Sequence, residues 1–159
     1  MGAKGEALAK QFEAKAQEAT AVLEKLSDAD WKKITAAEKW SVAVTAHHVA
    51  GSHEAIANII GTVAAGQSIP NFTMDMLHEM NAKHAQDFAN VTKAETIALH
   101  KKGVAAAAAV VRGLSDEQLA RSGTVLTGVP PMTAEQVVTG ILINHIEDHF
   151  GSIRKTVGG

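Results

Sequence analysis

The chain has no cysteine and no tyrosine among its 159 residues. Without cysteine it cannot form disulfides, redox-active CxxC motifs, zinc ribbons or a cysteine nucleophile. A metal site would therefore have to use histidine, carboxylate or backbone oxygen. Proline is confined to Pro70, Pro130 and Pro131, and the stretches between them are rich in alanine, glutamate, lysine and glutamine. This composition favours helices, and no segment has a convincing strand pattern.

An excess of charge of one sign and a long apolar run are also missing. The 15 basic and 17 acidic residues give a net charge of -2, and the basic residues are scattered rather than grouped in the stripe of a nucleic-acid binder. No apolar run approaches the roughly 18 residues of a membrane span, and the N-terminus carries acids early, unlike a signal peptide. We therefore expect a cytoplasmic protein that binds neither nucleic acid nor membrane. Its length predicts a single domain over residues 1–159.

Capping residues and apolar periodicity predict four long helices. Their expected bounds are about Gly5 to Lys25, Ser41 (as N-cap) to Ala65, Thr92 (in a capping box with Glu95) to Arg112, and Thr133 (in a capping box with Gln136) to Thr156. Between the first two, Ser27 or Asp28 can cap a short turn that carries Trp31. Four long helices in one small domain predict an all-α four-helix bundle.

The link between the second and third helices, residues 66–91, is long for a compact bundle. Its middle, TMDMLHEMNAKHAQDFAN, has the pattern of a further helix. Such a helical crossover can span the full length of the bundle, so the second and third helices can run parallel, which a short hairpin loop would forbid. A second connection, residues 114–131, is expected to be irregular.

The segment NHIEDHFGSIR places His145 and His149 four residues apart on the fourth helix. On a helical wheel His149 falls within the apolar face and His145 on its edge, whereas Glu147 and Asp148 fall away from it. Two imidazoles one turn apart on an inward face form a natural pair of metal ligands. The alternative is a pair of core histidines that hydrogen-bond to other side chains, although several ring nitrogens would then need partners.

A third ligand would have to come from another helix. On the second helix, His48 and His53 flank the apolar stripe on opposite sides, and periodicity does not choose between them. His47 lies almost opposite the stripe and is expected to be solvated. His100 lies close to the apolar stripe of the third helix and is a weaker candidate for an inward position. His78 and His84 are expected at the surface of the crossover.

Three motifs follow one another along the chain: WSVAVTAHHVAGSH, then NAKHAQDF before an Ala-rich helix, then NHIEDHFGSIR. Their order and spacing resemble the DinB-like (DNA-damage-inducible) family over nearly the whole chain. Members of that family begin the second helix with Trp-Ser or Trp-Thr and place a histidine eight residues after the tryptophan, here Trp40 and His48. An H-x3-H pair on the last helix, here His145 and His149, completes their triad.

The resemblance implies a four-helix bundle with an up-down-down-up course. It also implies a divalent metal, such as zinc, nickel or iron, held by His48, His145 and His149 with open positions for water. The family is related to bacillithiol-dependent transferases and mycothiol-dependent maleylpyruvate isomerases. Those isomerases have a glutamate where this chain has His145, so their reaction does not carry over. The family name refers to damage-induced expression and implies no DNA binding.

Two classes of function remain open at this point. We favour a metal-dependent thiol S-transferase or hydrolase that acts on a small molecule, with a low-molecular-weight thiol as the candidate substrate, because a metal with open positions can activate water or a thiol. No catalytic residue can be named: Glu54 and Glu147 face away from the core, and Asp148 is marginal. The alternative is a non-catalytic metal- or ligand-binding protein of the stress response. The run VAAAAAVV at 104–111 would permit close helix packing, either within the core of one chain or between the two chains of a homodimer.

The scattered basic residues predict weak binding to nucleic acid. At modest salt, duplex DNA should bind this protein no better than it binds a generic acidic protein, because no basic cluster can release many counterions. Fluorescence anisotropy with a labelled duplex measures this affinity. Micromolar binding that weakens steeply with salt would contradict the prediction.

Overall fold

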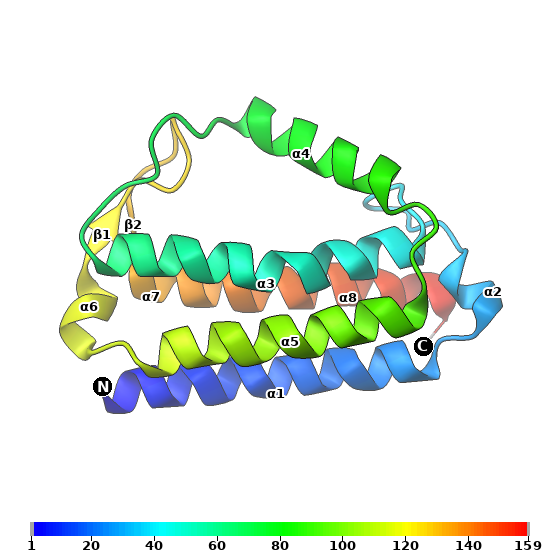
Figure 1. Ribbon diagram of the computed structural model, residues 1–159, viewed down its shortest axis with the longest axis horizontal. Helices are drawn as coiled ribbons and strands as arrows, with labels where there is room; N and C mark the ends of the chain where they lie inside the picture. Colours follow the sequence, from blue (N-terminus) through cyan, green and yellow to red (C-terminus); the bar gives the residue numbers. More distant parts are fainter. Residues whose placement is uncertain (1, 159) are drawn as a thin grey trace.

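Four long helical segments form the body of the computed structural model, which describes residues 2–158 (Figure 1). Three of them are α1 (Ala3–Lys25), α3 (Val42–Ala64) and α5 (Lys93–Arg112). The fourth is continuous through α7 (Ala134–Val137), the π-helical segment η1 (Val138–Ile143) and α8 (Asn144–Val157). The all-α four-helix bundle expected from the sequence is confirmed.

The four segments run in an up-down-down-up course (Figure 1). After α3, the crossover helix α4 (Met74–Asp87) leads the chain back along the bundle, so α5 runs parallel to α3. The predicted helical crossover is therefore correct, and it is what allows consecutive long helices to be parallel. The last segment then returns antiparallel to α3 and places α8 beside the first half of α3.

The predicted helix starts lie at the observed N-caps, Ser41, Thr92 and Thr133. Thr133 and Gln136 form the full capping box. At Thr92 the box is incomplete: its hydroxyl accepts from the Glu95 N–H, but the Glu95 carboxylate accepts from that hydroxyl rather than from the Thr92 N–H. The bond from the Glu95 N–H to the Thr92 hydroxyl caps the first turn of α5 without the second bond of the box.

The π-helical segment η1 was not expected from the sequence. A π-helix closes its hydrogen bonds over five residues, so it shifts the helical phase between Thr133 and the histidines that follow. A wheel drawn at constant pitch from Thr133 therefore describes the faces of α8 only approximately. Within α8 the pitch is regular, so His145 and His149 stay one turn apart.

The connections at the two ends of the bundle contain short helices and strands. The α2 helix (Asp28–Trp31) is capped by Ser27, one of the two predicted caps. The stretch expected to be irregular contains α6 (Asp116–Ala120) and β1 (Ser122–Gly123), and β1 pairs antiparallel with β2 (Met132–Thr133). Within residues 2–158 no helix is long and apolar enough to cross a membrane.

α5 packs tightly against α3 at Gly103. A Cβ at this position would lie 3.1 Å from the Ala50 carbonyl oxygen and 3.1 Å from the His53 Cβ. Both neighbours belong to buried residues of α3 and have little room to move. Gly103 therefore sets the spacing of the parallel helix pair that forms the middle of the bundle.

The replacement Gly103→Ala should lower the free energy of unfolding by about 1–3 kcal/mol, because the added methyl group overpacks the α3–α5 contact. Gly61→Ala is the matched control: Gly61 also lies inside a long helix, but nothing is within 4 Å of a Cβ there. The control should raise stability by about 0.5–1 kcal/mol. Urea unfolding measures both; equal effects of the two variants would show that Gly103 has no packing role.

Candidate metal centre

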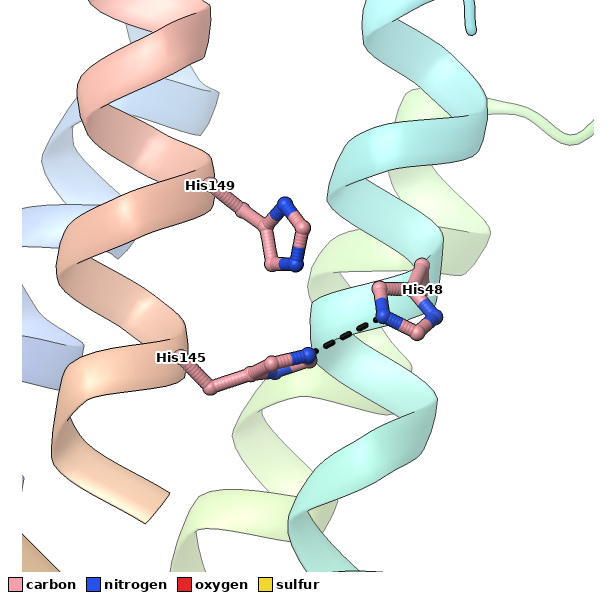
Figure 2. A group of neighbouring side chains, drawn as sticks. All are labelled: His48, His145 and His149. Carbon is pink, nitrogen blue, oxygen red and sulfur yellow. Dashed lines mark hydrogen bonds between the residues drawn. The ribbon is translucent and has the colours of Figure 1, made fainter. Parts of the chain in front are cut away.

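Three histidine rings from two helices meet between α3 and α8. Figure 2 shows His48 on α3 facing His145 and His149, which project from successive turns of α8. One ring nitrogen of each histidine lies within 4.8 Å of the other two. The Nε2 atoms of His48 and His145 are 3.0 Å apart. The three side chains named by the sequence pattern and the family resemblance are thus brought together by the fold.

The separation of the His48 and His145 nitrogens and the charge state of both rings suit a metal ion, although 3.0 Å is also the distance of a hydrogen bond between the two rings. Two nitrogens that bind one ion at about 2.0–2.1 Å, with an angle between about 90° and 110°, lie about 2.8–3.4 Å apart. Burial, together with the neighbouring imidazoles, lowers the pKa of His48 to about 4 and that of His145 to about 2. Both rings are therefore neutral near pH 7 and offer the lone pairs that a metal requires.

His149 is held on its outer side by Glu38. Its Nδ1 lies 2.6 Å from Oε2 of Glu38, and the Ser152 hydroxyl donates to Oε1 at 2.7 Å. Burial alone would raise the pKa of Glu38, but hydrogen bonds from Ser152, His149 and Thr35 outweigh it and keep the pKa below its ordinary value. The carboxylate is therefore ionised beside the site, and only 9% of its side chain is exposed.

Sequence reasoning missed Glu38. The acids considered from the sequence lie on helices, where a helical wheel predicts which way a side chain points. Glu38 lies in the loop before α3, to which no wheel applies. One signal could have pointed to it: an acid two residues before Trp40, in the stretch AAEKWS that leads into α3. The Trp40 ring itself packs edge-on against His48, with ring centroids 5.3 Å apart.

The expectation that His47 is solvated was wrong, because the crossover covers that side of α3. His47 is 7% exposed, and its Nδ1 lies 2.8 Å from Nε2 of His84. The Phe88 ring stacks on His47 with a centroid distance of 4.2 Å. His84 was expected at the surface and is instead half-buried, with its ring 5.7 Å from that of His48. His78 is exposed, as expected.

His53, the alternative to His48, belongs to a different hydrogen-bonded pair. Its Nε2 lies 3.0 Å from Nδ1 of His100, and the other ring nitrogen of His100 donates to the Ala16 carbonyl at 3.1 Å. Both histidines are 1% exposed, so the inward prediction for His100 is correct. Periodicity left His48 and His53 open; the structure places His48, and not His53, in the cluster with His145 and His149.

The helical bundle and the three-histidine cluster define a class of four-helix proteins with a candidate metal centre. A family model described as the DinB superfamily matches residues 11–153, and the chain belongs to this superfamily. No curated protein matches the sequence.

Solved structures share the fold at low sequence identity. The mycothiol-dependent maleylpyruvate isomerase has a TM-score of 0.75 and 14% identity, over 94% of this chain and 60% of that chain. This chain thus spans 60% of the length of the isomerase. YfiT from Bacillus subtilis, described as a probable metal-dependent hydrolase with an unusual four-helix bundle topology, has a TM-score of 0.70 and 19% identity, over 98% of this chain and 86% of that chain.

The buried histidines predict a loss of stability in acid. Burial lowers the pKa of His53 to about 3, with a further contribution from His100, and the pKa values of His48 and His145 are lowered as well. The unfolded chain takes up these protons near pH 6.5, whereas the folded chain does so only at lower pH. The free energy of unfolding should therefore be constant above about pH 7, begin to fall at about pH 6.5 and continue to fall as the pH drops through about 4 toward the folded-state pKa values of these histidines.

Each such histidine contributes a slope of up to about 1.4 kcal/mol per pH unit. Urea unfolding of the metal-free protein across this range measures the slope. His53→Gln should make it shallower, whereas replacement of the exposed His78 by Ala should leave it unchanged. A flat profile between about pH 6.5 and 4 would contradict the depressed pKa values.

Proposed function

We propose that the protein binds one divalent metal through His48, His145 and His149 and acts on a small molecule as a metal-dependent thiol S-transferase or hydrolase. The observation that carries the proposal is the convergence of one nitrogen from each of three imidazoles within 4.8 Å. The fold relatives support it: one is described as a probable metal-dependent hydrolase and another as mycothiol-dependent.

The three imidazoles fit the role of ligands in a reactive site rather than a closed structural one. Three protein nitrogens leave coordination positions open, and a bound divalent metal would lower the pKa of a water or thiol there. The chain's own part is to keep His48 and His145 neutral by burial and to fix His149 through Glu38. Imidazole nitrogen suits zinc, nickel and iron alike, so the ligand set does not select among these metals.

A non-catalytic metal-binding protein is the second candidate, and one observation favours it. Within the described part of the chain, Glu38 is the carboxylate in hydrogen-bond contact with the triad, and both of its oxygens are engaged by His149 and Ser152. A carboxylate with both oxygens occupied is less available as a general base. Assays of the metal-loaded protein with small thiols and electrophilic acceptors separate the two candidates, since only an enzyme would lose a thiol-dependent activity when the metal is removed.

Replacement of any triad histidine by alanine should abolish stoichiometric retention of zinc or nickel, because two imidazoles cannot hold the ion as three do. Metal content after gel filtration measures the retention. His53→Gln is the matched control: it changes a buried histidine of α3 that is bonded to His100 and lies outside the cluster. If His53→Gln loses the metal and His48→Ala keeps it, the assignment of the ligands is wrong.

A further inference from the structure

The loop before α3, residues 33–41, is closed by its own backbone. The Thr35 N–H donates to the Trp40 carbonyl at 2.8 Å, and the Lys39 N–H donates back to the Thr35 carbonyl at 3.0 Å. The Val42 N–H donates to the Lys33 carbonyl at 2.8 Å. These bonds tie the loop directly to the first turn of α3, so its backbone is held at a fixed position relative to that helix.

The same loop contacts histidines of two different helices. Trp40 packs edge-on against His48 of α3. Two residues earlier, Glu38 accepts hydrogen bonds from His149 and Ser152 of α8. His149 and Ser152 are one turn apart on α8, so both oxygens of the Glu38 carboxylate accept hydrogen bonds from the same face of that helix. The loop thereby joins α3 to α8 at the level of the triad.

The contact with Glu38 decides which nitrogen of His149 carries the proton. An ionised carboxylate can only accept hydrogen bonds, so Nδ1 of His149 must be the donor at 2.6 Å. In the neutral ring the second nitrogen, Nε2, then keeps its lone pair. With one nitrogen bonded to Glu38, Nε2 is the atom of His149 that can serve as a ligand.

We propose that Glu38 is a positioning residue that holds His149 as the Nδ1–H tautomer, with Ser152 fixing the carboxylate. The effect on the tautomer is a property of the metal-free protein. Its consequence, stronger binding of a metal by His48, His145 and His149, rests on the function proposed above. Outer partners of this kind typically change metal affinity by 10–100-fold.

The first experiment measures the tautomer without metal. In the protein labelled with ¹⁵N-histidine, two-bond ¹H–¹⁵N spectra distinguish the protonated from the unprotonated ring nitrogen. Wild type should show His149 protonated at Nδ1, whereas Glu38→Ala should shift it toward a mixture that includes the Nε2–H form. Ser152→Ala, which leaves His149 and Glu38 in place, should give a smaller shift toward the Nε2–H form. This variant tests the effect of the carboxylate on the tautomer even if the Glu38 variant folds poorly.

The control is Glu147→Ala. Glu147 is an acid on α8 between the two histidines, but it is half-exposed and pairs with Lys15 at 2.8 Å. Its removal should leave the His149 spectrum unchanged. A wild-type His149 protonated at Nε2, or the same tautomer in wild type, Glu38→Ala and Ser152→Ala, would overturn the proposal.

The second experiment measures zinc affinity by competition with a chromophoric chelator. Glu38→Ala should bind zinc about 10–100-fold more weakly than wild type, Glu38→Gln should lie between them because its amide oxygen still accepts but carries no charge, and Glu147→Ala should match wild type. If wild type binds no zinc, the proposed function fails. The measurement of the His149 tautomer in the metal-free protein still tests whether Glu38 positions that ring. If wild type binds zinc and Glu38→Ala binds it equally well, the positioning role fails and the proposed function stands.

Discussion

The packing of α8 against the first half of α3 is the contact on which the candidate site depends. His48 comes from one of these helices and His145 and His149 from the other, so neither helix carries the cluster alone. The contact exists because the crossover lets α3 and α5 run parallel, which leaves the side of α3 free for the returning last segment. A bundle in which each helix simply reversed the one before would bring together different faces.

Burial of imidazoles is the second constraint. His53 and His100 are almost completely buried, and the triad and His47 are shielded from solvent to differing degrees. A buried imidazole is stable only when it is neutral and its nitrogens find partners. The core pair meets this demand internally, through the Ala16 carbonyl. The triad meets it in part: Nδ1 of His145 is buried without a partner among the described residues, whereas His149 is bonded to Glu38.

Features that depend on one helix alone could be predicted from the sequence. The burial of a helix face could not be predicted where a neighbouring segment covers that face. Helix starts at Ser41 and Thr133 depend on local caps, and both were correct. The side of α3 that carries His47 reads as solvent-facing from α3 alone, but α4 lies over it, and Phe88, the residue that follows α4, stacks on His47. The π-helical segment escaped prediction because it replaces one regular hydrogen-bond pattern by another without a residue signal such as proline.

The sequence by itself determined the helices, their approximate ends, and the pair His145 and His149 on one face, since caps and a regular helical pitch act over a few residues. The family resemblance then favoured His48. Only the tertiary structure decided between His48 and His53, because both flank the same apolar stripe and the partner of each comes from another helix. It alone also placed Glu38 beside His149: a loop side chain has no periodic direction, so its contacts are set by how distant segments pack.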